Sequence, residues 1–113
     1  MNIFLPIKLE SINQYYRHFQ GRVTISDRGR QQKQIIHKYI EDNKLPKLEG
    51  PVQIYVVCCY KDFKVRDIDN VLKPLIDCLK DKCFGDDKFV CRITIEKMYN
   101  PEVESVFINI QKL

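Results

Sequence analysis

The chain passes from strand-like to helix-like sequence along Val65-Arg-Asp-Ile-Asp-Asn-Val-Leu-Lys-Pro-Leu-Ile-Asp77, and Gly85-Asp-Asp87 follows shortly after it. The first stretch brings two carboxylates, an amide and a lysine together where a strand should turn into a helix. Carboxylates gathered in this way repel one another unless a cation lies among them. The pattern therefore predicts a site for a hard metal ion at this turn, with a further acidic pair close by.

The segments on either side of this turn predict a strand packed against a helix. Residues 52–60 are rich in β-branched and aromatic residues, and their near-continuous apolarity predicts a central strand with both faces covered. The helix should begin near Asp69 or Asn70 and end near Lys82, with a slight kink or a late start because Pro74 lacks a backbone donor. Its sheet-facing stripe follows helical spacing: Leu72, Leu75, Ile76 and Leu79.

The remaining elements follow from turn and cap signals. Residues 3–9 predict a short first strand, which Pro6 places at a sheet edge or bends. Residues 11–25 predict a loose hairpin or a loop around a tight turn at Gln20-Gly21, and Ser26 is a suitable N-cap for a helix that runs to about Asn43. After a connection over residues 45–51 and the turn at 85–87, residues 89–98 and 103–110 predict two strands.

The resulting β-α-β-α-β-β order predicts an α+β fold: a mixed sheet of about four strands with two main helices on one face. The chain has 113 residues, 44% hydrophobic and 30% charged, which are the proportions of one folded domain over residues 1–113 rather than of a disordered tail. Its net charge of +4 permits nucleic acid as a partner without requiring it.

The sequence also excludes several classes of protein. The first residues lack the pattern of a secretory signal, and no apolar run approaches the roughly 18–20 residues needed to cross a bilayer. The five cysteines are odd in number and lack paired zinc-ligand spacing, which favours reduced thiols. We therefore expect a cytoplasmic protein without a membrane partner, and a buried thiol at Cys58 or Cys59.

The acidic residues support two interpretations. Asp67 and Asp69 leave an extended segment on the same face, so they can bind one cation; alternatively, Asp69 is only a helix N-cap. Asp86 and Asp87 can likewise be turn residues alone, but a crossover to a neighbouring strand would bring Asp87 close to Asp67 and Asp69. Three carboxylates form an oxygen-only ligand set, which suits Mg²⁺ or Mn²⁺ and not zinc.

Lys73 lies four residues after Asp69 and three after Asn70, so a regular helix would place all three on one face. The lysine can form a surface ion pair, or it can stabilise negative charge on a phosphate held beside the metal. Asp77 continues that face one turn later, where it either fixes Lys73 or is a solvated acid. The candidate catalytic groups are Lys73 and the three carboxylates of Asp67, Asp69 and Asp87.

The run Asp67-Ile-Asp-Asn-Val-Leu-Lys73, followed by Asp77 and Asp86-Asp87, resembles the signature of RusA-type Holliday junction resolvases. The upstream Asn13-Gln-Tyr-Tyr-Arg-His18, Gly21-Arg22 and Ser26 are also similar to that family's N-terminal segment. The resemblance implies a homodimer that nicks two opposing strands of a four-way DNA junction symmetrically, during recombination and repair. It implies Mg²⁺ held by Asp67, Asp69 and Asp87, with Asp86 as the adjacent candidate, and Lys73 as an essential lysine.

The same resemblance suggests which side chains contact DNA. Basic residues in two segments would bind phosphates: Arg17, Arg22, Lys61, Lys64 and Arg66. Tyr15, Tyr16 and Phe63 would stack on unpaired bases, or the tyrosines would cover the core. Three alternatives remain: an endonuclease for flaps or forks, a non-catalytic nucleic-acid-binding module, and a structural or protein-interaction domain.

Overall fold

The computed structural model describes residues 1–62, 64 and 67–113. Its main sheet has the strand order β1-β6-β4-β5, formed by β1 (Asn2–Leu5), β6 (Ser105–Lys112), β4 (Val52–Tyr60) and β5 (Val90–Tyr99). The β4–β5 pair is parallel, whereas β6 runs antiparallel to both of its neighbours. The predicted mixed four-stranded sheet is therefore confirmed.

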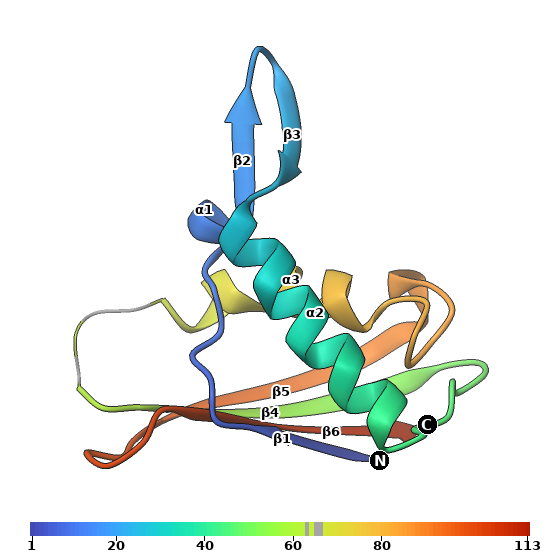
Figure 1. The fold of residues 1–113 in the computed structure, drawn as a ribbon. Coiled ribbons are helices and arrows are strands. Elements are labelled where there is room, and N and C mark those ends of the chain that lie inside the picture. Colours follow the sequence, from blue (N-terminus) through green and yellow to red (C-terminus); the bar gives the residue numbers. More distant parts are fainter. Residues whose placement is uncertain (63, 65–66) are drawn as a thin grey trace.

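The helices lie on one face of this sheet (Figure 1). They are α1 (Ile12–Tyr15), α2 (Asp27–Asp42) and α3 (Leu72–Leu79), with the 3-10 turns η1 (Ile68–Val71) and η2 (Asp87–Phe89) before and after α3. A second, two-stranded sheet, β2 (Tyr16–Phe19) with β3 (Arg22–Ile25), projects away from the body as a hairpin (Figure 1). The arrangement confirms the predicted α+β class.

Strand β4 is central in the sheet, as predicted, but the prediction that both of its faces are covered is wrong. Its side chains alternate between buried and half-buried along the whole strand. Val52, Ile54 and Val56 face the helices and belong to the core, whereas Tyr55 and Val57 lie on the face that α2 and α3 do not cover. Apolar content alone could not distinguish these two faces.

The N-terminal segment differs from its predicted form. Strand β1 ends at Leu5 instead of residue 9, because Pro6 has no backbone donor to continue pairing with β6. Residues 11–25 contain a turn of helix, α1, before the hairpin. The predicted turn at Gln20-Gly21 is confirmed: both residues have positive φ, 49° and 75°, as a two-residue type I′ turn requires.

The two main helices begin and end for local reasons. The predicted N-cap of α2 is confirmed, since the Ser26 hydroxyl accepts a hydrogen bond from the Gly29 amide. Helix α3 begins at Leu72, after η1, so Pro74 lies in its first turn, where a missing donor costs little. The predicted late start is therefore confirmed, but α3 ends at Leu79, before the predicted Lys82, and Asp81 adopts a positive φ of 68°.

The core lies between the sheet and α2 and α3. All five cysteines are free thiols, as expected; Cys58, Cys78 and Cys83 are buried and Cys91 is exposed. Among the described residues, no helix has the length and apolarity that crossing a membrane requires.

Candidate active site

An open groove of about 440 Å³ follows helix α3 along the edge strand β5. The connection from β4 through η1 and α3 to the parallel strand β5 creates this groove, because it lays α3 on the sheet and returns the chain through η2. The groove is lined by Asp69, Leu72, Lys73, Ile76, Asp77, Asp87, Val90 and Ile93. Asp69 and Asp87 therefore contribute to one surface, although α3 separates them in the sequence.

Asp69 lies inside η1 instead of at a helix N-cap, so the alternative that it serves only as a cap is wrong. The residue at the N-cap of η1 is Asp67, and the residue at the N-cap of α3 is Val71. The Asp69 side chain is exposed and forms no hydrogen bond or ion pair with any described residue. Within the part of the chain that the structure describes, no side chain competes with a ligand in the groove for this carboxylate.

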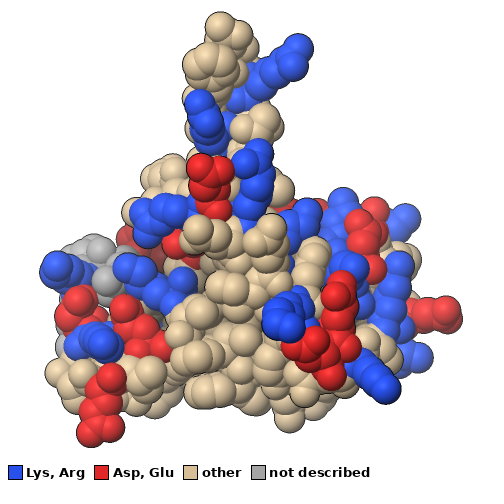
Figure 2. Space-filling view, viewed as in Figure 1, with Lys and Arg blue, Asp and Glu red and all other residues tan. Residues whose placement is uncertain are grey.

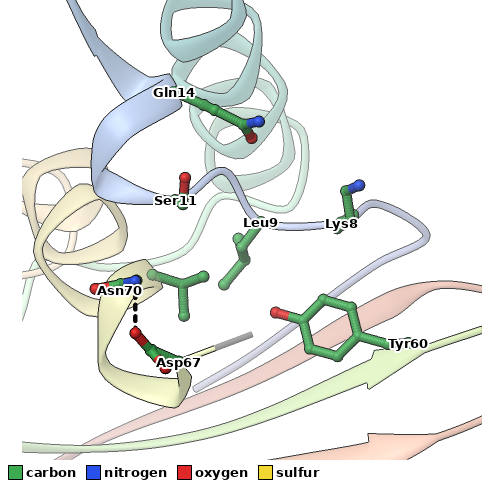
Figure 3. Close-up of a pocket in the computed structure, with 8 residues that line it drawn as sticks. Lys8, Leu9, Ser11, Gln14, Tyr60, Asp67 and Asn70 are labelled. Carbon is green, nitrogen blue, oxygen red and sulfur yellow. Dashed lines mark hydrogen bonds between the residues drawn. The ribbon is translucent and has the colours of Figure 1, made fainter. Parts of the chain in front are cut away.

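Asp67 borders a neighbouring pocket of about 350 Å³, shown in Figure 3. In this pocket the Asn70 Nδ2 donates a hydrogen bond of 3.4 Å to Asp67 Oδ2. The prediction that Asn70 shares the face of Asp69 and Lys73 is therefore wrong. In a 3-10 turn, residues three apart eclipse each other, so the Asn70 side chain lies on the same side of η1 as Asp67. Asp69 and Lys73 line the groove instead.

Lys73 is held at the groove by two neighbours. Its Nζ lies 3.5 Å from Asp77 Oδ2 and 6.0 Å from the centre of the Tyr16 ring. The Tyr16 hydroxyl donates a hydrogen bond to the same Asp77 oxygen. Burial, followed by this hydrogen bond, raises the pKa of Tyr16, so the phenol remains a hydrogen-bond donor at alkaline pH values where a solvated tyrosine would ionise. Asp77 is thus a partner of Lys73 and not merely a solvated acid.

The acidic pair after α3 divides into two roles. The Asp86 carboxylate caps η2 by accepting a hydrogen bond from the Lys88 amide at 3.4 Å. A hydrogen bond with the Asp87 side chain, followed by the one from Lys88, lowers the pKa of Asp86. Asp87, by contrast, lines the groove. The geometry favours Asp87 over Asp86 as the acidic residue that faces a ligand.

Within the described residues, no three His, Cys, Asp or Glu side chains lie close enough together to hold a metal ion. The structure places Asp69 and Asp87 on the same groove and Asp67 in the adjoining pocket. The predicted set of three ligands therefore stays a prediction.

The candidate DNA-contacting residues lie on two parts of the surface. Arg17 and Arg22 are exposed on the projecting hairpin, where Lys and Arg side chains gather (Figure 2). Lys61 and Lys64 are exposed after β4, while Arg66 and Phe63 lie outside the described residues.

The two neighbouring tyrosines have different environments. Tyr15 is fully buried, so it covers the core and cannot stack on a base. Tyr16 is half-buried, and its bond to Asp77, 61 residues away, was not visible in the sequence. No local pattern marks a contact between side chains that are so far apart along the chain.

Comparison with known proteins agrees with the motif. The family model described as "Endodeoxyribonuclease RusA" matches residues 6–111. The chain is 36% identical over 90 residues to crossover junction endodeoxyribonuclease RusA of Enterobacteria phage 82 and to that of Shigella sonnei. It is 34% identical to the Escherichia coli K12 protein of that name, and each match covers 78% of this chain and 75% of the relative. The chain therefore belongs to the endodeoxyribonuclease RusA family.

Proposed function

We propose that residues 1–113 act as one endonuclease domain that resolves four-way DNA junctions by symmetric paired nicks, in recombination and repair. The observation that carries this proposal is the groove along α3, where Asp69, Lys73 and Asp87 line one surface. We infer the substrate from the family, because relatives that match most of the chain are named crossover junction endodeoxyribonucleases.

The groove suits a hard divalent cation, Mg²⁺ with Mn²⁺ as a substitute. Its acidic side chains offer only oxygen donors, and the exposed Asp69 carboxylate has no partner among the described residues. Mg²⁺ often takes only one or two protein carboxylates and completes its shell with water and substrate phosphate, so a cage of three acids within reach of each other is not required. We propose that Asp69 and Asp87 hold the ion from the groove and that Asp67, in the adjoining pocket, completes the set of acidic residues around it; when bound, the ion would activate water and offset phosphate charge.

The reaction would be hydrolysis of one phosphodiester per groove. The water oxygen forms a bond to phosphorus, and the bond from phosphorus to the 3′ oxygen breaks, which leaves a 5′-phosphate and a 3′-hydroxyl that a ligase can seal. Lys73, an exposed ammonium at the groove, would donate hydrogen bonds to the phosphate oxygens. Because negative charge accumulates on these oxygens in the transition state, a fixed cation there lowers the barrier.

Phosphate contacts outside the groove would orient the junction. Arg17 and Arg22 on the hairpin and Lys61 and Lys64 after β4 are exposed, and we propose that they bind the DNA backbone together with Arg66. Such contacts add affinity that depends on salt and not on sequence.

Paired nicks require two grooves on one junction, so we propose a homodimer with twofold symmetry. Light scattering during gel filtration should give a mass of twice 13.5 kDa. A complex with junction DNA that contains only one protein chain per junction would contradict the symmetric mechanism.

The substitution Asp69→Asn tests the proposed chemistry. It should abolish cleavage of a synthetic four-way junction in Mg²⁺, while binding is retained or tightened because one charge that repels phosphate is lost. Asp42→Asn is the matched control, since Asp42 is an exposed acid on α2 that pairs with Lys38. Cleavage by Asp69→Asn at the unmodified rate would show that the metal assignment is wrong.

The choice of substrate separates the proposed function from its alternatives. A four-way junction, a Y-fork and plain duplex should be compared at equal concentration. Paired, ligatable nicks in the junction alone support resolution, whereas cleavage of the fork indicates a nuclease for other branched DNA. Binding without cleavage of any substrate would indicate a non-catalytic module, and no binding at low salt would indicate a structural domain.

A further inference from the structure

We propose that Tyr16 is a positioning residue for Lys73: acting through Asp77, it ties the proposed catalytic ammonium to the base of the β2–β3 hairpin. This inference rests on the proposed function, because it assigns a task to the residues that surround Lys73. Both Tyr16 and Asp77 lie in the segments that resemble the family, but the sequence gives no contact between them, and that contact is what the inference rests on.

The Lys73–Asp77 pair is too weak to fix the lysine by itself. The two side chains are one turn apart on α3, their charged atoms are 3.5 Å apart, and the Lys73 side chain is 62% exposed. An ion pair with this exposure is worth little, because water screens it and both side chains lose freedom. Some other contact must hold Asp77 if Lys73 is to stay at the groove.

Tyr16 supplies that contact. Its hydroxyl donates to Asp77 Oδ2, the same oxygen that Lys73 approaches, so one carboxylate oxygen connects the phenol and the ammonium. The Asp77 side chain is only 28% exposed, which strengthens a hydrogen bond to its charge. The face of the Tyr16 ring also lies 6.0 Å from Lys73 Nζ, within the range of a cation–π interaction. Lys73 is thus held by two groups: the Asp77 carboxylate, which the Tyr16 hydroxyl positions, and the face of the Tyr16 ring.

The core fixes Tyr16 in turn. The rings of Tyr15 and Tyr16 meet edge to face, with centres 4.8 Å apart and planes at 76°. Tyr15 is fully buried, and its hydroxyl lies 3.4 Å from Cys78 Sγ on α3. A side chain locked by packing in this way holds its hydrogen-bond partner accurately.

Tyr16 is also the first residue of β2, where it pairs with Ile25 at the base of the hairpin. Lys73 borders both the acidic groove and a second pocket of about 250 Å³ beneath the hairpin, lined by Ile12, Asn13, Tyr16, His18, Val23 and Lys73. DNA that contacts the hairpin and the groove together would pass over Lys73. Through its contact with Asp77, Tyr16 therefore couples the position of the hairpin to the position of Lys73.

Tyr16→Phe tests this role, because it removes the hydroxyl and keeps the ring. We expect the single-turnover cleavage rate at saturating enzyme to fall about tenfold, while the junction Kd changes by less than about twofold. Tyr39→Phe is the matched control, since Tyr39 is half-buried on α2 and its hydroxyl has no partner among the described residues. An unchanged rate in Tyr16→Phe would overturn the proposal.

A double-mutant cycle separates positioning from general destabilisation. If Tyr16 acts through Asp77, Tyr16→Phe should cause no further loss in an Asp77→Ala background; independent, additive losses would overturn the proposal. Asp77→Asn retains an oxygen acceptor for Tyr16 but removes the charge that faces Lys73, so it should reproduce the rate loss. This variant also tests the proposal if Tyr16→Phe does not fold.

A nuclear magnetic resonance measurement without DNA or metal tests the contact independently of cleavage. The ¹⁵Nζ signal of Lys73 should differ from those of solvated lysines and move toward them in Tyr16→Phe, but not in Tyr39→Phe. If the signal does not move, Tyr16 does not position Lys73, even if cleavage falls. If the unmodified protein does not cleave junctions, the proposed function fails, and this measurement alone decides whether Tyr16 holds the lysine.

Discussion

Gly29, the third residue of α2, packs directly against the base of the hairpin. A Cβ atom at this position would overlap the backbone carbonyl oxygen of Tyr15 and lie 2.8 Å from Ile25 Cγ2. The carbonyl oxygen cannot move aside easily, because it accepts a hydrogen bond of 2.9 Å from the Ser26 amide. The absence of a side chain at Gly29 therefore allows α2 to lock Tyr15, and with it Tyr16, in place.

Gly29→Ala should lower the free energy of unfolding by about 2–3 kcal/mol, since the added methyl group overpacks a rigid backbone contact. Urea denaturation measures this loss. Gly85→Ala is the control: its Cβ would meet only Phe89 at an ordinary 3.7 Å. Equal stability of the two variants would mean that α2 does not depend on this close approach.

The role of Lys73 can be distinguished from that of the proposed metal ligands by measuring both the cleavage rate and the Mg²⁺ affinity. Lys73→Ala should reduce junction cleavage by about a hundredfold, because one cation facing the phosphate is lost. The Mg²⁺ affinity measured by isothermal titration calorimetry should stay the same. An equal loss of metal affinity would instead make Lys73 a structural partner of the acidic residues.

The β2–β3 hairpin contributes no fully buried residue to the core. Two isolated strands are marginally stable in water, and this pair exposes Phe19 and Val23, by 59% and 60%. Its base is held by Ser26, whose hydroxyl donates toward the Gln14 and Tyr15 carbonyl oxygens at 2.5 and 3.0 Å. A rigid base with exposed basic side chains along the sides of the hairpin is the arrangement expected of an element that contacts a large, negatively charged partner (Figure 2).

Removing both hairpin arginines should weaken DNA binding without a preference for sequence. Arg17→Ala combined with Arg22→Ala should reduce the slope of log K against log salt by about 2, one unit for each lost phosphate contact. Fluorescence anisotropy over a series of salt concentrations measures the slope. Lys47→Ala with Lys112→Ala removes the same charge from exposed residues outside the hairpin, and an equal change there would assign the effect to net charge.

Elements governed by local chemistry were predictable from the sequence. The cap at Ser26, the turn at Gln20-Gly21 and the late start at Pro74 each depend on neighbouring residues, and each is confirmed. Contacts between distant segments were not predictable, as the bond between Tyr16 and Asp77 shows.

The candidate site was predictable to the same extent. The sequence identified Asp69, Lys73 and Asp87, which line one groove, but it directed Asn70 to the wrong face, since spacing rules for an α-helix do not hold in a 3-10 turn. The prediction that helices cover both faces of β4 was wrong because the apolar content of a strand does not show whether one or both of its faces are covered.

At the scale of the whole molecule, the core contains several ionisable groups that must stay neutral. Burial raises the pKa of the Cys58 and Cys83 thiols to about 11, from an ordinary value of 9.0. Burial also raises the pKa of Cys78 and, beside it, of Tyr15. Each of these groups favours the folded state only while it is protonated.

The folded protein should therefore lose stability in alkali. A thiol whose pKa is higher in the folded state contributes its full stability below pH 9, and this contribution declines as the pH rises toward 11. Urea midpoints measured from pH 7 to 10.5 should be level at first and then fall. Replacing Cys58 by Ala should make this decline shallower, although the tyrosines preserve part of it, whereas Cys91→Ala should leave it unchanged because Cys91 is exposed. A midpoint that stays level throughout would show that the thiols titrate equally in the folded and unfolded chain, and that the core admits water.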